Sequence, residues 1–409
     1  MVAGLNVPVV GPLLMEGFAG GAYSKFRPDP PFNATTIANM ECNPNAPTSI
    51  PYTYDKTVGL GFKAAIMLKT TGDGFRGRVG FEIVLNRSYG VSSISFYGRG
   101  ELSAKIPTDR IAGVGNQLAN NLRNVANSSP AVSSIVSSAD EVRKKGKQVD
   151  DNPGSAPEGN IAFWFGMLWD FENDVMHGEA EAYINIGNVL VGNGPNGRMG
   201  WMSMHFAPNS CYIHAGNPQD RLGLKVQIGP VRAQVSSYVM MGHGIPTQLP
   251  LPPAQVVNLL NLNTSSSAFQ RSTADRDSLT TGSGFALGFD LSIDTGPQQF
   301  AMFYGQFGVG AGIDMLLLKR NGISVCGTDA GSNGFYALGQ FYAYLQAEVG
   351  IRVRQKKFEI LSAGVAALMQ GGMPNPAWMS GHVGGKFRIF GIKRNFDFNV
   401  RLGNECSGI

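Results

Sequence analysis

The chain has 409 residues with a net charge of +4, and only 15% of its residues are charged, against about 25% in ordinary domains. Its 54 glycines would each weaken a helix interior by roughly 1 kcal/mol. These properties exclude a coiled coil, a charged disordered tail and a long helical bundle. The basic residues do not gather on one face, so we expect no nucleic-acid partner.

Residues 1–103 form the first predicted β segment. Val79, Phe81 and Ile83 alternate with polar residues such as Arg78 and Glu82. Successive side chains of a strand point to opposite faces, so this period of two predicts a strand with one apolar face. No unbroken apolar run follows a basic start at the N-terminus, which favours an excised or mature chain over one with a signal peptide.

Residues 104–160 are predicted to be a helical insertion followed by a linker. Ile111, Val114, Leu118 and Leu122 recur at helical spacing, which is typical of a short amphipathic helix. The stretch 148–159 is rich in Asp, Pro and Gly, which favours an exposed linker.

Residues 161–246 form the second predicted β segment. Met202, Met204 and Phe206 alternate with Ser203 and His205. A Gly- and Asn-rich turn at 192–197 is a hairpin signal, and close hairpins produce antiparallel pairs. Residues 247–280 then break the pattern with a proline-rich entry, a short helix expected at 254–262 and a Ser/Thr-rich loop.

Residues 281–409 form the third predicted β segment. Residues 334–353 alternate over an unusual length, with Phe341, Leu345 and Val349 on one face and Tyr342 and Tyr344 on the other. The expected fold is mainly β, a long antiparallel meander in the form of an extended sheet, sandwich or superhelix. We expect the three segments to form one continuous β architecture with two short helical insertions.

Three carboxylates are the first candidate site. Asp170, Glu172 and Asp174 lie at alternate positions in a stretch that resembles a strand, 169–175. On one strand face they would lie about 6.6 Å apart, a spacing that could serve calcium or a glycosidase pair. The full calcium-loop pattern is missing, so a solvated acidic face is favoured.

Two histidines are the second candidate site. His205 and His214 flank a Pro-Asn turn, and with Cys211 they could form a small metal site across a hairpin. Such a set has too few ligands for a metal, and two ordinary histidines on a polar face or in a turn are favoured. Nucleophile and nucleotide-binding motifs are absent from the sequence. We therefore predict no catalytic residues, no cofactor and no metal.

The four cysteines, Cys42, Cys211, Cys326 and Cys406, are candidates for disulfides. Each lies in a polar, turn-like setting, where a cysteine is a poor core residue. The sequence leaves all three pairings open.

Three stretches carry a resemblance to a known group of proteins: 206–218, 334–351 and the Pro-Asn-Pro segment 373–378. They resemble β-rich regions of very large exported proteins of Gram-negative bacteria. The resemblance implies export to the cell surface, the periplasm or the medium. It also implies that the chain is part of a longer protein, whose other segments or surface proteins would be its partners. It supplies no catalytic residues.

The leading functional hypothesis is a non-enzymatic structural, scaffold or adhesion module of a larger exported protein. The alternative is a carrier of a hydrophobic ligand such as lipid, with an apolar β groove or a barrel. A membrane barrel is a variant of this alternative. Asp290, Asp294, Arg352 and Arg354 count against that variant because they would have to face a lumen, and the C-terminus lacks an aromatic girdle.

Overall fold

The computed structural model describes residues 2–28, 52–71, 74–103, 160–262, 282–300, 302–319, 324–325, 328–329, 331–353 and 356–403. The fold class is confirmed: the described residues are mainly strands, and the paired strands are antiparallel. The predicted helical insertion at 104–160 lies outside the described residues except for Asn160, which begins a strand.

The chain divides into two compact units, which are described separately. Unit 1 comprises Met1–Thr108 with Asp151–Ala215, and unit 2 comprises Asp109–Asp150 with Gly216–Ile409. The predicted segment 161–246 therefore contributes strands to both units.

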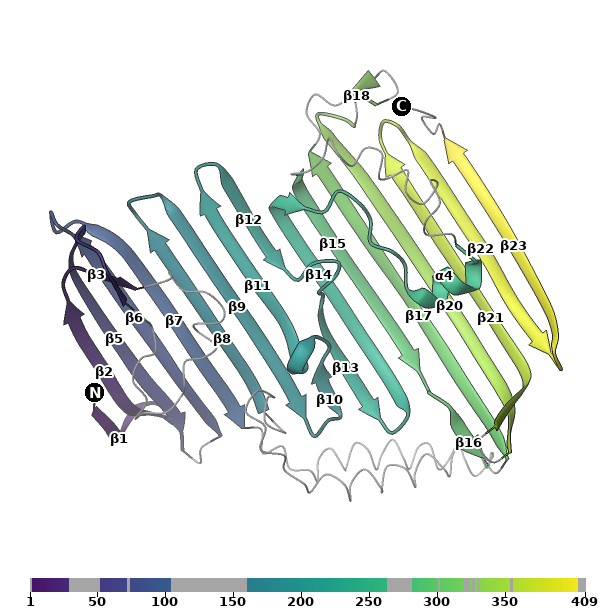
Figure 1. Ribbon diagram of the computed structural model, residues 1–409, viewed down its shortest axis with the longest axis horizontal. Coiled ribbons are helices and arrows are strands. Elements are labelled where there is room, and N and C mark those ends of the chain that lie inside the picture. The colour runs from purple at the N-terminus through teal and green to yellow at the C-terminus, as the bar shows by residue number, and fades with distance from the viewer. Residues whose placement is uncertain are drawn as a thin grey trace. The chain divides into compact units, whose positions relative to one another are not determined.

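The sheet of unit 1 is a meander of long strands (Figure 1). Each pairs with its successor in the order β1, β2, β5, β6, β7, β8, β9, β11, β12. The short β10 pairs with β9, and β3 pairs with β4 in a small separate sheet. The strands are β1 (Val2–Val10), β2 (Leu13–Tyr23), β3 (Phe26–Pro28), β4 (Tyr52–Tyr54), β5 (Val58–Thr70), β6 (Phe75–Asn86), β7 (Val91–Ser103), β8 (Asn160–Asp170), β9 (Val175–Ile186), β10 (Leu190–Gly192), β11 (Arg198–Ala207) and β12 (Ser210–Ala215).

Unit 2 repeats this arrangement with longer strands. They pair in the order β13, β14, β15, β17, β20, β21, β22, β23, and the short β16 pairs with β17. A two-residue pair, β18 with β19, is separate. The strands are β13 (Leu222–Ile228), β14 (Val231–Ile245), β15 (Gly282–Asp294), β16 (Gln298–Phe300), β17 (Phe303–Lys319), β18 (Ser324–Val325), β19 (Thr328–Asp329), β20 (Phe335–Val353), β21 (Lys356–Met373), β22 (Trp378–Ile389) and β23 (Ile392–Gly403).

One α-helix occurs among the described residues, α4 (Ala254–Leu260), together with the 3₁₀ turn η2 (Pro195–Gly197). Pro253 precedes α4, as the proline-rich entry predicts, and the left-handed backbone of Asn261 ends it before the predicted end at 262. The predicted loop after it lies beyond residue 262, outside the described residues. No helix in the described ranges is both long and apolar enough to cross a membrane.

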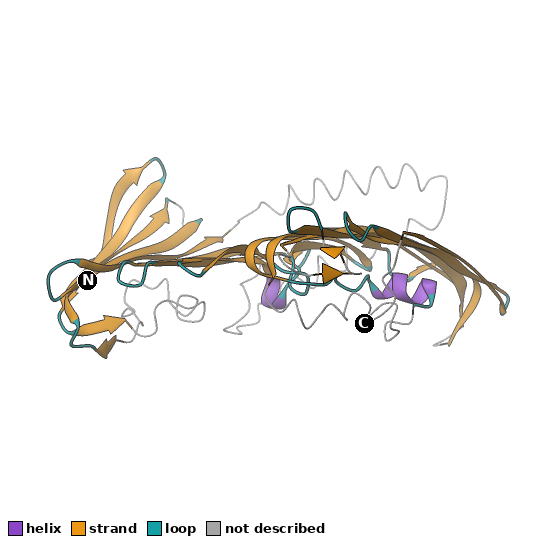
Figure 2. Cartoon of the chain, turned by 90° about the horizontal axis from the view of Figure 1, so that it is seen from above, coloured by secondary structure: helices purple, strands orange, loops and turns teal. Residues whose placement is uncertain are grey.

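Helix α4 lies on one side of the unit 2 sheet (Figure 2). Its Val256 is fully buried in a cluster with Tyr342, Ala366 and Leu368 of β20 and β21. Gly364 makes this close approach feasible, because a Cβ there would lie 2.4 Å from Leu259 Cδ2. The helix therefore covers only one of the two sheet faces.

Several glycines make room for tyrosine rings that lie across the strands. In each case a Cβ on the glycine would come within 2.1–2.6 Å of the ring of the tyrosine directly opposite. A glycine covered by a cross-strand aromatic ring is a known device for stabilising a curved sheet. The pairs are Gly61 with Tyr23, Gly80 with Tyr97, Gly288 with Tyr238, Gly310 with Tyr344, Gly312 with Tyr342 and Gly350 with Tyr304.

Candidate functional site

The sheet of unit 2 has one face of uncovered apolar side chains, here called its apolar face. Phe341, for example, lies between Ile313 and Met369 on the neighbouring strands. The register brings the predicted apolar positions of consecutive strands into line, as the period of two requires. The face is formed by side chains that are each 38–46% exposed: Phe289, Leu291, Ile313, Met315, Phe341, Leu345, Val349, Val365, Met369, Val383 and Phe387.

Unit 1 carries an apolar face of the same kind. Phe96 pairs with Phe81 and with Met167, and Trp169 pairs with Ile94. Trp169 also stacks on Phe171 with ring centroids 5.0 Å apart. The large side chains of this face are 37–49% exposed: Phe18, Phe62, Ile66, Val79, Phe96, Phe163, Trp169, Met202 and Phe206.

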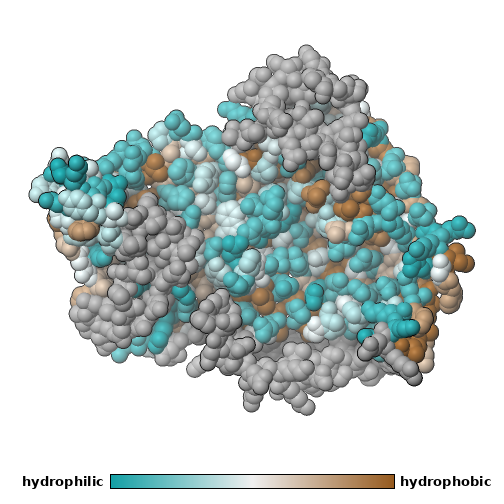
Figure 3. All heavy atoms as spheres, in the orientation of Figure 1, coloured by the Kyte–Doolittle hydropathy of each residue, from teal (hydrophilic) through white to brown (hydrophobic). Residues whose placement is uncertain are grey.

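The opposite side of each sheet, its polar face, carries most of the ionisable residues. The view in Figure 3, in the orientation that shows α4 in front, is largely hydrophilic over the described strands. Several charged, hydroxyl-bearing or amide residues of these faces are nevertheless buried: Arg78, Glu82, Ser95, Tyr97, Ser236, Tyr238, Asp314, Gln340 and Tyr342.

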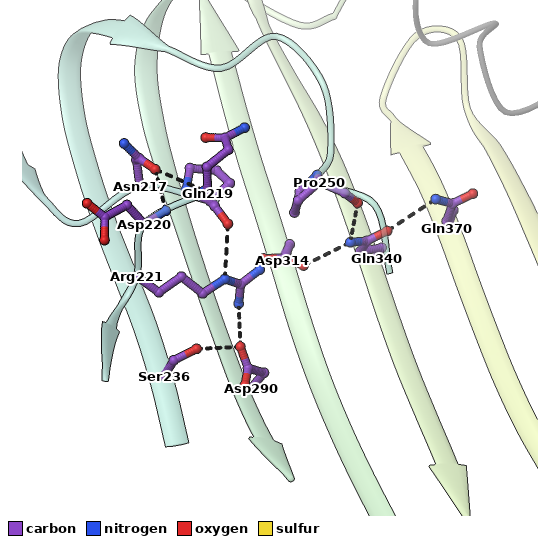
Figure 4. Close-up of polar contacts among 11 residues, drawn as sticks. Asn217, Gln219, Asp220, Arg221, Ser236, Pro250, Asp290, Asp314, Gln340 and Gln370 are labelled. Carbon is purple, nitrogen blue, oxygen red and sulfur yellow. Dashed lines mark hydrogen bonds and ion pairs between the residues drawn. The ribbon is translucent and has the colours of Figure 1, made fainter. Parts of the chain in front are cut away.

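An ion-pair network occupies the polar face of unit 2 (Figure 4). Arg221, just before β13, contacts Asp314 Oδ1 at 2.7 Å and Asp290 Oδ2 at 3.1 Å. The Arg221 guanidinium carbon also lies 5.0 Å from the centre of the Tyr238 ring. One guanidinium thus neutralises two carboxylates and stacks on an aromatic ring, which its planar, delocalised charge allows.

Amide groups complete the coordination of Asp314, which is fully buried. Gln340 Nε2 donates to Asp314 Oδ2 at 2.8 Å and to the carbonyl of Pro250 at 2.8 Å. Gln370 in turn donates to Gln340 at 3.2 Å. Because an unpaired buried charge costs several kcal/mol, these partners are what permit a carboxylate at this position.

The loop before β13 positions Arg221. The Asn217 side chain accepts hydrogen bonds from the backbone amides of Gln219 and Asp220, at 2.9 and 2.8 Å. An Asn side chain that binds the backbone two and three residues ahead fixes a turn. This turn brings Arg221 onto the strands that carry Asp290 and Asp314.

The polar face of unit 1 has a different centre, the fully buried Glu82. The hydroxyls of Tyr23 and Tyr52 both donate to Glu82 Oε1, the latter at 3.0 Å. Lys63 Nζ donates to the Tyr52 hydroxyl at 3.1 Å and lies 4.3 Å from the centre of that ring. Burial, and next the charge of Glu82, raises the pKa of Tyr52 above its usual range. Tyr52 therefore remains a hydrogen-bond donor to the carboxylate.

The structure corrects the prediction for the three carboxylates. Strand β8 ends at Asp170 and residues 171–174 form a turn, so Asp170, Glu172 and Asp174 do not share a strand face. The Asp170 side chain instead accepts from the backbone amides of Glu172 and Asn173, at 3.0 and 3.1 Å. Side-chain bonding of this kind favours a turn over a strand. Glu172 lies 3.9 Å from Arg27.

The two predicted histidines share the polar face of unit 1 without meeting. His205 lies opposite His177 and Tyr212, and Tyr212 stacks between His205 and His214. Cys211 lies opposite Phe206, on the apolar face, so it does not converge with them. Within the ranges that the structure describes, no group of three His, Cys, Asp or Glu residues could hold a metal ion.

The disulfide prediction stays open. Cys42, Cys326 and Cys406 lie outside the described residues, and Cys211 is exposed on β12.

The buried network was not predicted as a site from the sequence. In the sequence, Asp290 stands out only as a charged strand residue that would have to face the lumen of a barrel, and Arg221 and Asp314 lie in no recognised motif. The one available signal was that strands such as β15 and β17 place Asp among glycines and tyrosines on the face opposite their large apolar residues.

No family model and no curated protein matches the chain. Among solved structures, the chain is similar to a loop L8 deletion mutant of OmpT, an outer membrane protein of Vibrio cholerae. The TM-score is 0.21 and the sequence identity 9%, over 87% of this chain and 89% of the other.

Proposed function

We propose that this protein is a membrane-embedded β protein of the cell envelope, whose apolar faces contact lipid and whose polar faces are kept away from it. This is the membrane variant of the alternative hypothesis. One observation carries the proposal: in each unit, the side chains of one face are apolar and uncovered, while charged side chains of the other face are buried.

Large uncovered apolar side chains along a whole sheet face are not what water favours. An antiparallel sheet in water packs its apolar face on a core and exposes its polar face. Full burial of a large apolar side chain is worth about 1.5–3 kcal/mol, so a half-exposed one forgoes on the order of 1 kcal/mol. Large exposed apolar patches mark surfaces that contact a membrane or another protein. Hydrocarbon contact would recover this free energy across both apolar faces.

The strands are long enough for this role. A strand tilted across the hydrocarbon layer needs about 9–11 residues. In unit 2, β17 has 17 residues, β20 has 19 and β21 has 18. In unit 1, β5 has 13 residues and β8 has 11.

The charges that counted against this variant lie where the proposal needs them. Asp290 is on the polar face and is bound by Arg221 and Ser236. Asp294 accepts from the backbone of Gly296 at 2.6 Å, and Arg352 lies on the polar face of β20 beside Gln299. Arg354 lies outside the described residues. None of the three described residues would contact lipid.

The test uses two tryptophans of the same strand. Trp169 is 49% exposed on the apolar face of β8, whereas Trp164 is buried on the polar face, where its Nε1 donates to Glu181 at 3.1 Å. Two variants of the full chain would each keep one of the two and replace the other three tryptophans with Phe. Each variant would be reconstituted in phosphatidylcholine vesicles with dibrominated acyl chains, which quench only indoles that contact them.

We expect strong quenching of Trp169 and little quenching of Trp164. If the protein floats with the vesicles but the fluorescence of Trp169 is not quenched, the proposal is contradicted. A chain that stays in solution without detergent, with no bound lipid by mass spectrometry, would instead favour the water-soluble scaffold or adhesion module. A chain in solution with bound acyl chains would favour the lipid carrier.

A further inference from the structure

A cavity of about 570 Å³ lies beside the C-terminal end of α4 in unit 2. Strands β17, β20, β21, β22 and β23 supply its polar lining, and Leu259 and Asn261 line it on the side of the helix. Sites for small molecules usually measure about 300–1,000 Å³. The cavity therefore has the size of a small-solute site.

The charged residues that line the cavity are mostly basic. On the polar face they are three cations, Lys386, Arg388 and Lys393, and a single carboxylate, Glu348, and Arg394 lines the cavity from the other face. The Tyr304 hydroxyl donates a hydrogen bond to Glu348 at 2.6 Å. This bond partly satisfies the charge of the carboxylate. The cavity thus keeps a net positive charge and attracts an anion.

The three cations retain donors that their protein contacts do not use. Lys386 Nζ donates to the Asn258 carbonyl and to Asn261, which leaves the third N–H of its ammonium group. Arg388 uses one nitrogen on Glu359, at 2.7 Å, out of five N–H donors. Lys393 is exposed and lies directly opposite Arg388 on the next strand.

Four amide side chains surround these cations: Gln306, Gln346, Asn261 and Asn395. Each can both donate and accept a hydrogen bond, which suits the hydroxyl groups of a polar solute. Clustered Lys and Arg donors suit phosphate oxygens, since charge-assisted hydrogen bonds are the strongest of their kind.

We propose that this cavity binds a small phosphorylated, hydroxyl-bearing solute, with its phosphate among Lys386, Arg388 and Lys393. The amides would bind its hydroxyl groups. The inference goes beyond the proposed membrane function and does not rest on it, because the cavity lies within unit 2 and on its polar face.

The experiment is calorimetric titration of the full chain, in a neutral detergent, with glucose 6-phosphate as the probe and glucose as the uncharged control. Lys393→Gln should weaken the binding of glucose 6-phosphate about three- to tenfold, as expected for loss of one partly exposed charge. Lys319→Gln is the matched control, since Lys319 is exposed at the far end of β17 and does not line the cavity. It should leave the affinity unchanged.

A lipid headgroup presents the same phosphate chemistry, so a second arm adds phosphatidylglycerol to the micelles. The solute site is supported if glucose 6-phosphate binds, if Lys393→Gln weakens this binding as expected, and if the lipid does not displace the solute. Displacement by phosphatidylglycerol would assign the cavity to a headgroup and overturn the solute. The absence of binding, equal binding of glucose, or equal losses in both variants would overturn the site itself. None of these outcomes depends on the quenching of Trp169.

Discussion

The two units bury a carboxylate on the polar face in different ways. In unit 2, Asp314 is neutralised directly by Arg221, at 2.7 Å. In unit 1, the hydroxyls of Tyr23 and Tyr52 bind Glu82, and Lys63 acts on it through Tyr52. One centre therefore depends on a single charge, and the other spreads its stabilisation over several hydrogen bonds.

The difference predicts unequal sensitivity to substitution. A buried ion pair contributes little net stability, but removal of one partner leaves an uncompensated charge and is severe. A carboxylate held by neutral hydroxyls loses only part of its support when one donor is removed. Unit 2 should therefore be vulnerable at one residue, whereas unit 1 should lose stability in smaller steps.

The largest effect is expected for Arg221→Met. This substitution should lower the free energy of unfolding by about 3–5 kcal/mol, because Asp314 is fully buried and would lose its counter-charge. Urea titration in detergent micelles, followed by tryptophan fluorescence, measures the change. Arg27→Met is the control, since its pair with Asp55 is exposed and should cost less than about 1 kcal/mol.

A second substitution shows whether charge is the cause. Asp314→Asn in the Arg221→Met background should recover about 1–3 kcal/mol, because the buried charge is then gone. If the double variant were less stable than Arg221→Met alone, the loss would come from packing on Tyr238 and the comparison would fail.

Glu82→Gln should have a smaller effect. The amide keeps an oxygen for the two tyrosine hydroxyls but loses the charge that strengthens both bonds, so we expect a loss of about 1–2 kcal/mol. The same urea titration measures it. A loss as large as that of Arg221→Met would show that both units depend on a single charge.

Tyr52→Phe should have the smallest effect of the three. It removes the hydroxyl that joins Lys63 to Glu82 and leaves the Tyr23 bond in place, at a cost of about 1 kcal/mol. A matched variant, Tyr54→Phe, changes a ring that is 63% exposed in the same short strand and should be neutral. Equal effects of the two substitutions would argue against the chain of hydrogen bonds from Lys63 through Tyr52 to Glu82.

The sequence predicts much of the fold because the two-residue period is a local property. The alternation over 334–353 places Phe341 and Tyr342 on opposite faces, and β20 (Phe335–Val353) has this arrangement. The prediction failed at 169–175, where the side chain of Asp170 binds the backbone and forms a turn. Alternating carboxylates are compatible with both structures, so the pattern alone could not distinguish them.

The role of the glycines is a second feature that the sequence predicted only in part. From composition it served only to exclude helices, whereas the structure places Gly80, Gly288 and Gly312 beneath the rings of Tyr97, Tyr238 and Tyr342. These pairs depend on the register between strands, which the composition of a single strand does not contain.

By itself, then, the sequence determined which segments are strands and which of their side chains share a face, because these depend on neighbours along the chain. Only the tertiary structure decided which face is covered and which charges meet. Arg221 and Asp314 are 93 positions apart, and their contact depends on the loop at Asn217 and on the register of the strands between them. The long-range pairing of strands therefore created both the buried network and the uncovered apolar faces.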